Sequence, residues 1–241
     1  MKIYKLGLIA LFTLFLFSCE KETEDLSRPT YYVAFEILGE NPAIVQVGEV
    51  YVDAGAIATL QGENVTTKME TVNNVDYEAM GMYQVEYSAI NADGLKSRAV
   101  RNVIVCNPAV TVDIGGIWRA SPDGTYRSFG GETPYGGPDY TVRINRLAPG
   151  FFSVSDFLAG WYEVRAGYGS SYAIGGYIAL NEDNTIDLIS SAVSPWGVEV
   201  DYVINGIYDP DTDPDVEIIN WVTGFGAPLG SAMVFYVSLY K

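Results

Sequence analysis

The residues best suited to chemistry in this chain are aromatic side chains that lie beside turn-forming or acidic residues. Exposed tryptophan and tyrosine rings stack on the apolar face of a sugar, and a neighbouring carboxylate accepts hydrogen bonds from its hydroxyl groups. Trp196 is the strongest candidate, because the segment Ser194-Pro195-Trp196-Gly197 predicts a loop that presents the ring. The candidate ligand-binding residues are Trp196, Trp161, Tyr162 and Trp221, with Asp156 nearby in the sequence.

Each of these rings has an alternative role in a hydrophobic core. Small β-domains fill their interiors with aromatic side chains, so any one of these rings is also a core candidate. Trp118 opens a predicted strand and is expected in the core. A sugar-binding surface therefore requires that some of the other rings are exposed.

The residue types argue against catalysis. The chain has no histidine, which removes His-based triads, His metal sites and the commonest general base. Cys106 has no histidine to activate it and is expected to be a buried or half-buried free thiol. No pair of carboxylates stands out as a glycosidase pair. We expect no catalytic residue and no cofactor.

An acidic segment near the C-terminus has the spacing of a calcium loop. The run from Asp209 to Glu217 places oxygens at every second position. It lacks the glycine that an EF-hand loop needs at its sixth position, and Pro210 and Pro214 restrict it. We interpret it as a solvated hairpin loop and assign no metal site, with calcium binding left open.

The N-terminus predicts export. Lys2 and Lys5 precede an apolar stretch from Leu6 to Phe17, which is too short for the ~20 residues of a membrane-spanning helix. Residues 1–18 have the pattern of a signal peptide, and residues 19–29 form a polar tether.

The end of this signal resembles the lipobox of bacterial lipoproteins. The residues Leu16-Phe17-Ser18-Cys19 carry the resemblance, which implies cleavage before Cys19 and a lipid on its thiol. The following run Glu20-Lys21-Glu22-Thr23-Glu24-Asp25 resembles the surface-export signal of Bacteroidota lipoproteins, although Thr23 interrupts its acidic pair. The resemblance implies attachment to the outer membrane facing the cell exterior. A periplasm-facing anchor is the alternative.

Net charge narrows the possible partners. The whole chain carries a net charge of −16, and removal of residues 1–18 takes away two lysines and no acid, giving about −18. Such a surface repels nucleic acid and anionic lipid, so the sequence predicts no nucleic-acid partner. The membrane contact is expected through the lipid on Cys19 alone.

Residues 30–107 predict an immunoglobulin-like β-sandwich. Tyr83, Val85, Tyr87 and Ala89 share one face of a strand by alternation, and a polar turn with Gly94 leads into the next strand. About seven short runs with closely spaced turns are typical of such a sandwich. The predicted runs are Tyr31–Ile37, Ala43–Val47, Val50–Val52, Ala56–Leu60, Val65–Met69, Tyr83–Ala89 and Leu95–Val105.

This half resembles a bacterial Ig-like domain found at the front of Bacteroidota surface lipoproteins. The most specific part is Gly81-Met82-Tyr83-Gln84-Val85-Glu86-Tyr87-Ser88-Ala89, with Asp53-Ala54-Gly55 upstream. The resemblance implies a spacer role and identifies no binding residue.

Residues 108–241 predict an antiparallel β-barrel or a lipocalin-like β-domain, which makes the whole chain all-β. Asn107-Pro108 marks the seam, since proline ends a strand ladder. About nine strand candidates follow, mostly in hairpin order. A glycine-rich aromatic stretch from Tyr126 to Tyr140 is expected to be a flexible surface loop. The strand candidates are Gly116–Ala120, Tyr140–Leu147, Phe151–Ser155, Tyr162–Ala166, Ala173–Leu180, Thr185–Ser191, Glu199–Tyr208, Glu217–Thr223 and Met233–Leu239.

The second half resembles the C-terminal β-domain of uncharacterised lipoproteins from glycan-utilisation loci. The stretch Ser153-Val154-Ser155-Asp156-Phe157-Leu158-Ala159-Gly160-Trp161-Tyr162 carries most of the resemblance. It implies a polysaccharide or oligosaccharide as ligand and other outer-membrane proteins of the same system as partners. It establishes no reaction.

Three functions remain after these observations. The first is a non-catalytic glycan-binding surface lipoprotein, with the Ig-like domain as spacer. The second is a structural or adhesion protein that contacts another protein through an apolar patch or an open strand edge. The third is a lipocalin-like carrier, which requires a closed barrel with an empty apolar interior.

Overall fold

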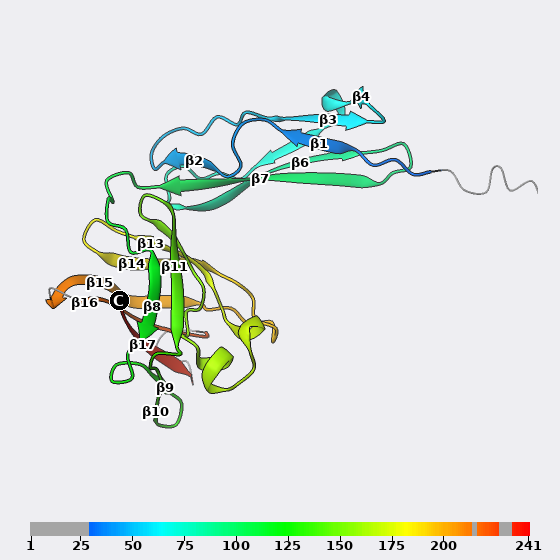
Figure 1. Cartoon of the computed structure of the whole chain (residues 1–241). Coiled ribbons are helices and arrows are strands. Elements are labelled where there is room, and N and C mark those ends of the chain that lie inside the picture. Colours follow the sequence, from blue (N-terminus) through cyan, green and yellow to red (C-terminus); the bar gives the residue numbers. More distant parts are fainter. Residues whose placement is uncertain (1–28, 214–215, 227–232) are drawn as a thin grey trace, which may run out of the picture.

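The computed structural model describes residues 29–213, 216–226 and 233–241, and nearly all of its regular structure is β-strand (Figure 1). The all-β class predicted from the sequence is confirmed. The predicted signal peptide, Cys19 and the tether up to Arg28 lie outside the described residues. Among the described elements, none of the helices is long and apolar enough to cross a membrane.

The N-terminal half is a sandwich of two sheets. Val85, Tyr87 and Ala89 are buried on one face of β6, as the alternation predicts. Two runs that were predicted as strands are not strands: Val50–Val52 is irregular, and Val65–Met69 contains the 3-10 turn η2 (Thr66–Lys68). One sheet contains β1 (Ala34–Ile37), β3 (Ala56–Leu60) and β4 (Glu63–Asn64), and the other contains β2 (Ala43–Gln46), β7 (Lys96–Cys106), β6 (Gly81–Ile90) and β5 (Glu70–Asn73).

A buried ion pair fastens the loop between β2 and β3 to the sandwich. The Nε of Arg101 lies 3.1 Å from Oδ1 of Asp53, and the hydroxyls of Tyr51 and Tyr87 donate to the same carboxylate at 2.7 and 2.6 Å. Burial opposes ionisation of Asp53, but the hydrogen bonds from the two tyrosines and Gly55 and the charge of Arg101 outweigh it, so the pKa of Asp53 is lowered. This network links the loop that carries Asp53 to Tyr87 of β6 and Arg101 of β7.

The C-terminal half is a closed antiparallel barrel. Its wall runs through neighbouring strands in the order β8, β11, β12, β13, β14, β15, β16 and β17, and β17 pairs with β8 to close the ring. The first part of β17 pairs instead with β9, which extends the sheet at one end. The bounds are β8 (Gly116–Ala120), β9 (Tyr126–Ser128), β10 (Glu132–Pro134), β11 (Thr141–Ala148), β12 (Phe151–Val154), β13 (Gly176–Leu180), β14 (Thr185–Ser191), β15 (Tyr202–Asp213), β16 (Val216–Gly224) and β17 (Val234–Tyr240).

Side chains fill the interior of this barrel. Trp118, Phe152, Phe157, Trp221 and Phe235 belong to one buried cluster that spans the strands. The carrier hypothesis required an empty apolar interior, and this packing contradicts it, because large aromatic rings occupy the space that a hydrophobic ligand would need.

Two predictions about connections within the barrel were wrong. Tyr162–Ala166 was predicted as a strand but forms most of a π-helical turn, η3 (Trp161–Arg165), which Gly160 enters with φ 85°. The stretch from Tyr126 to Tyr140 was predicted as a flexible loop but forms the β9–β10 hairpin. The hydroxyl of Tyr135 there donates to the carbonyl of Leu158 at 2.7 Å, so this hairpin packs on the barrel.

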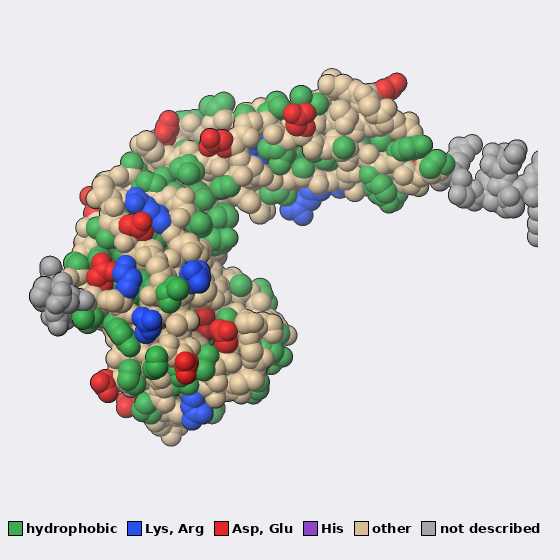
Figure 2. Space-filling view, viewed as in Figure 1, with side chains coloured by type: hydrophobic (Ala, Val, Ile, Leu, Met, Phe, Trp, Pro, Cys, Tyr) green, Lys and Arg blue, Asp and Glu red, His purple; other side chains and the backbone are tan. Residues whose placement is uncertain are grey.

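The two domains share a small hydrophobic cluster at their junction. Ile104 and Cys106 at the end of β7 pack with Ala148 and Phe151 at the β11–β12 turn. The side-chain amide of Asn107 donates a hydrogen bond to the carboxylate of Glu182 in the β13–β14 turn at 3.1 Å. Cys106 is a buried free thiol, as predicted. The Ig-like domain therefore rests on one end of the barrel and projects from it as an arm, with a hollow beneath it (Figure 2).

The long connections of the barrel gather at its other end. Short turns join the strands next to the Ig-like domain, whereas the connections 121–140, 155–175 and 192–201 follow strand ends that point away from it (Figure 1). Connections of this kind, held by a rigid scaffold, commonly carry binding residues. This end of the barrel is where a functional site is expected.

Candidate ligand-binding surface

Four aromatic side chains from two of these connections meet at the far end of the barrel, and we call them the aromatic platform: Tyr162, Tyr168, Tyr172 and Trp196. The ring of Trp196 lies 4.6 Å from Tyr162, 5.6 Å from Tyr168 and 4.6 Å from Tyr172, measured between ring centroids. Tyr162 and Tyr168 stack at 6.2 Å with nearly parallel rings. The platform is therefore one continuous aromatic surface and not four separate side chains.

The platform is open to solvent. Trp196 is 47% exposed and Tyr168 is 54% exposed, while Tyr162 and Tyr172 are half-buried beneath them. Edge-to-face contacts among the rings restrict their rotation, because each ring is held by its neighbours. Exposed rings that are already ordered lose little conformational entropy when they bind a ligand.

A buried carboxylate fixes the loop that carries three of the four rings. Asp156 is 2% exposed and accepts hydrogen bonds from the backbone amides of Leu158 at 3.0 Å, Gly160 at 2.7 Å and Ile174 at 3.2 Å. These bonds join the beginning of the loop 156–174 to its end. Asp156 therefore positions the platform from below without belonging to its surface.

Burial is also what sets the acidity of this carboxylate. Desolvation raises the pKa of Asp156 to about 6, even though the amides of Gly160, Leu158 and Ile174 favour its ionised form. The negative charge of Glu163 adds to the rise. A raised carboxyl pKa is typical of catalytic acids. Here the group is sealed inside the loop and its oxygens are occupied, so it holds structure.

A tight turn presents Trp196, as the sequence predicts. The amide of Gly197 donates to the carbonyl of Ser194 at 2.9 Å, and the amide of Ser194 donates to the carbonyl of Val198 at 2.7 Å. Gly197 has φ 77°, a conformation that glycine adopts without strain. The turn places the indole outward, against the tyrosines of the other loop.

Three of the candidate residues have roles different from the predicted ligand contact. Trp221 is 1% exposed, and its Nε1 donates to the carbonyl of Phe157 at 2.9 Å. Trp161 is buried against Tyr135 and Phe235, and Asp156 is buried as described above. None of these three reaches a ligand at the surface, because the barrel wall or the loop covers them. Tyr162 and Trp196 are the candidates that the structure brings together.

Sequence reasoning missed Tyr168 and Tyr172. Both lie in the segment Gly167-Tyr168-Gly169-Ser170-Ser171-Tyr172, where small residues surround the rings. Tyrosines in such a segment have few side chains nearby to bury them, which is a signal for exposure. The signal was present in the sequence, but the segment shows no alternation that would have drawn attention to it.

A polar groove adjoins the platform. It has a volume of about 340 Å³ and lies between the outer face of β8 and β11 and the loop that carries the tyrosines. Glu163 and Ser170 of that loop and Arg143 of β11 line it. Its size falls in the range of small-molecule sites, and its carboxylate, hydroxyl and guanidinium groups suit sugar hydroxyls. Rings for stacking and polar groups for orientation therefore lie side by side.

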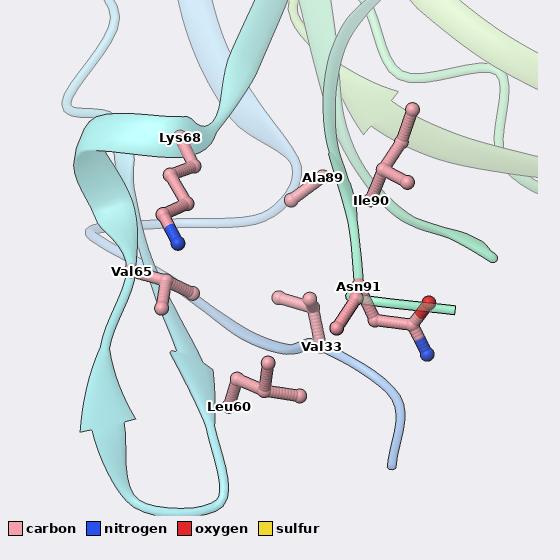
Figure 3. Close-up of a pocket in the computed structure, with 8 residues that line it drawn as sticks. Val33, Leu60, Val65, Lys68, Ala89, Ile90 and Asn91 are labelled. Atoms are coloured by element: carbon pink, nitrogen blue, oxygen red, sulfur yellow. The ribbon is translucent and has the colours of Figure 1, made fainter. Parts of the chain in front are cut away.

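A second hollow lies in the Ig-like domain and is a weaker candidate (Figure 3). Val33, Leu60 and Val65 point toward one another in it, and the side chain of Asn91 is directed away and donates to the carbonyl of Tyr31. Its volume of about 180 Å³ is below the range of most ligand sites. We interpret it as the incompletely closed end of the sandwich.

Within the described residues, no group of three or more acidic or cysteine side chains could hold a metal ion. The segment Asp209–Glu217, left open as a calcium loop, lies partly outside the described residues at 214–215. Glu217 itself pairs with Lys241 at 2.7 Å and accepts from the hydroxyl of Tyr208 at 2.9 Å. Its carboxylate already has protein partners.

Comparison with known proteins assigns both halves of the chain. A family model described only as a "-like, C-terminal domain" matches residues 107–241, and the model of the bacterial surface protein Ig-like domain matches residues 35–105. A search of curated proteins found no match.

Solved structures that are similar to the chain include three from Bacteroides and Clostridium. The lipoprotein BT2262 from Bacteroides thetaiotaomicron is 30% identical, covering 87% of this chain and all of its own, with a TM-score of 0.46. A protein of unknown function from Bacteroides ovatus is 11% identical over 87% of this chain and 94% of its own, with a TM-score of 0.33.

The third is a structure of two parts of ZmpB from Clostridium perfringens, the CBM51-2 in complex with GlcNAc and the INT domains. It is 18% identical over 51% of this chain and 31% of its own, with a TM-score of 0.27. All three TM-scores are below 0.5, so only the sequence identity to BT2262 and the family models bear on the identity of this chain.

Proposed function

The chain belongs to the family of the lipoprotein BT2262, and from this premise we propose that it binds glycans on the cell exterior without converting them. The lipid on Cys19 would hold it in the outer membrane. The Ig-like domain would serve as a stiff spacer, and the far end of the barrel would meet the ligand.

The observation that carries this proposal is the aromatic platform. Each of its four rings contacts at least one other ring of the platform, and two of them are about half exposed, so the rings offer a ligand one continuous aromatic surface. Sugar rings present flat faces of C–H groups that pack on such surfaces. The adjacent groove supplies hydroxyl and charged groups for orientation.

Binding without catalysis fits the chemistry of the same region. The buried acid of the platform loop, Asp156, uses its oxygens on three backbone amides. The chain has no histidine to act as a general base. The side chains around the platform therefore support recognition.

The test is binding of the full-length chain, produced with its own leader and purified in detergent, to a panel of plant, host and microbial polysaccharides by affinity gel electrophoresis. Trp196→Ala and Tyr168→Ala should each weaken binding at least about tenfold, as expected for central contacts of an interface. Tyr32→Ala is the matched control, since Tyr32 is a 62% exposed aromatic residue of the Ig-like domain.

Each outcome assigns the function differently. Retardation on one glycan class that either platform variant abolishes, and that Tyr32→Ala leaves intact, supports the proposal. Equal loss in Tyr32→Ala would indicate non-specific aromatic adhesion. Retardation on no glycan would overturn glycan binding.

Protein adhesion is a second candidate, favoured by a specific observation. Val193 and Val198 are exposed on the same connection as Trp196, so apolar side chains besides the rings face solvent at this end of the barrel. Exposed contiguous apolar surface is typical of protein-binding sites. Failure of all glycans, followed by binding of another outer-membrane protein that Val193→Asp and Trp196→Ala both abolish, would favour this function.

A further inference from the structure

An arginine lies at the same end of the barrel as the aromatic platform. Arg127 of β9 pairs in register with Phe235 of β17, so both side chains point to the same face of the sheet. The Cζ of Arg127 lies 4.3 Å from the centroid of the Trp161 ring and 5.4 Å from that of Phe129. The guanidinium is therefore held over an aromatic ring by a cation–π contact.

One donor of this guanidinium is buried and has no hydrogen-bond acceptor among the residues that the structure describes. Its Nε is buried without a partner, and no described carboxylate forms an ion pair with it. Arg98, Arg101 and Lys241 each pair with an acid at 2.7 to 3.1 Å. The described arginines Arg119, Arg143 and Arg165 form no ion pair either, but they are exposed to water, whereas the Nε of Arg127 is buried. Leaving a buried donor unpaired is costly, and functional sites are where such costs are found.

Arg127 borders the platform through shared neighbours. Its stacking partner Trp161 is followed directly by Tyr162, and both rings contact Phe235, at 5.9 and 6.4 Å. Burial raises the pKa of Tyr162, and the positive charge of Arg127 opposes that rise. The guanidinium is thus within electrostatic reach of the platform.

We propose that the glycan bound at the platform carries an isolated anionic group, the carboxylate of an acidic sugar or a sulfate ester, which Arg127 binds. The inference rests on the glycan-binding function proposed above. Arginine presents two parallel N–H groups that match a carboxylate or sulfate, and its stacking on Trp161 orders it in advance. Neighbouring neutral sugars stack on the platform.

The net negative charge of the whole protein disfavours a polyanionic ligand. The chain contains 30 acidic and 14 basic residues, which gives a net charge of −16. A densely charged polymer would be repelled over the surface around the site. Figure 2 shows acidic and basic side chains interspersed on the visible face of the barrel. An unpaired cation in this setting suits a mainly neutral glycan with sparse acidic groups.

The experiment compares charged glycans with their neutralised forms, using the full-length chain in detergent. Glucuronoxylan before and after carboxyl reduction tests a carboxylate, and mucin glycans before and after chemical desulfation test a sulfate. Polygalacturonate serves as the dense polyanion. We expect at least about tenfold tighter binding to one native glycan than to its neutralised form, and weak binding to polygalacturonate.

Four variants locate the contact. Arg127→Met should remove the preference for the charged form, and Arg127→Lys should keep part of it, since lysine retains the charge but loses the paired N–H groups. Arg165→Met is the matched control, an exposed arginine of η3 whose removal changes the net charge equally. Arg143→Met tests the arginine of the neighbouring groove.

The outcomes separate this inference from the proposed function. Equal affinity for native and neutralised glycans, with binding still lost in Trp196→Ala, would overturn the anionic ligand and leave glycan binding standing. If only Arg143→Met loses the preference for the charged glycan, the role of Arg127 would be overturned. Binding to no glycan would overturn both. If Arg127→Met fails to fold, two other measurements replace it. The unmodified protein, compared on native and neutralised glycan, tests whether the ligand is anionic, and Arg127→Lys tests whether Arg127 binds it.

Discussion

Two groups of aromatic side chains in the barrel domain contain the same residue types and lie in opposite environments. Trp118, Trp221 and Phe157 fill the interior and are sealed from solvent. The aromatic platform lies on the surface, with Trp196 and Tyr168 about half exposed. One group holds the barrel together, and the other is available to a ligand.

The boundary between the two groups falls between consecutive residues. Trp161 packs inward against Tyr135 and Phe235, whereas Tyr162 contacts Trp196 in the platform. Trp161 lies within the core, whereas Tyr162 is half-buried and contacts both the core ring of Phe235 and Trp196 of the platform. An aromatic residue type therefore predicts that a ring will pack against other rings. The path of the backbone decides whether that ring is buried in the core or exposed to a ligand.

The largest expected effect is a core substitution that sharpens this contrast. Trp221→Ala should lower the free energy of unfolding by about 4–5 kcal/mol, because it leaves a large cavity and removes the Nε1–H bond to Phe157. Urea denaturation followed by circular dichroism measures it. A loss below about 1 kcal/mol would mean that the ring is not part of the core.

Removal of the carboxylate that links core and platform should come next. Asp156→Ala leaves the amides of Leu158, Gly160 and Ile174 without their acceptor and should cost about 3 kcal/mol of stability. Because the loop then loses its closure, ligand binding should fall as well. Asp139→Ala, which removes an exposed acid, should change neither quantity. Unchanged binding in Asp156→Ala would show that the tyrosines hold their own arrangement.

The acidity of Asp156 predicts a pH dependence. Its pKa is about 6 in the folded protein, above the ordinary aspartate value of 3.8, so the folded state binds the proton more tightly than the unfolded state. The resulting stabilisation is fully present below about pH 4 and is lost as the pH rises through about 6.

The stabilisation that protonated Asp156 contributes should be at most about 2–3 kcal/mol. The free energy of unfolding of the unmodified protein, relative to that of Asp156→Asn, should therefore decrease between pH 4 and pH 7. A difference that is constant over this range would contradict the raised pKa.

The smallest effect is expected at the platform itself. Trp196→Ala should change the free energy of unfolding by less than about 1 kcal/mol, because the ring is half exposed and the turn that carries it is held by backbone hydrogen bonds. The same denaturation experiment measures it. A loss as large as that of Trp221→Ala would remove the distinction between the two aromatic groups and would favour a structural role for the platform.

Much of the architecture followed from local patterns. The alternation in Tyr83–Ala89 predicted the buried face of β6, and closely spaced turns predicted an all-β chain. Trp118 was expected in the core and is buried there. These predictions succeeded because strands have a fixed period of two, so the sequence itself separates one face from the other.

The platform could be predicted only in part. The turn around Trp196 was readable from Ser194, Pro195 and Gly197, whose conformational preferences are local. Trp221 and Asp156 had the right chemistry for a site, but the barrel wall and the loop closure bury them. Arg127 and Tyr168 gave no signal of a shared site, since about forty positions of chain separate them.

The sequence by itself determined the strand-rich composition, the acidic charge, the absence of histidine and a loop that presents one tryptophan. Only the tertiary structure decided which aromatic rings face outward. Closing a sheet into a barrel turns one face of every strand into interior, and the loops at its end bring distant residues together. Period-two alternation does not extend into a π-helical turn or a glycine-rich loop, so the division between Trp161 and Tyr162 depends on the folded path of the chain.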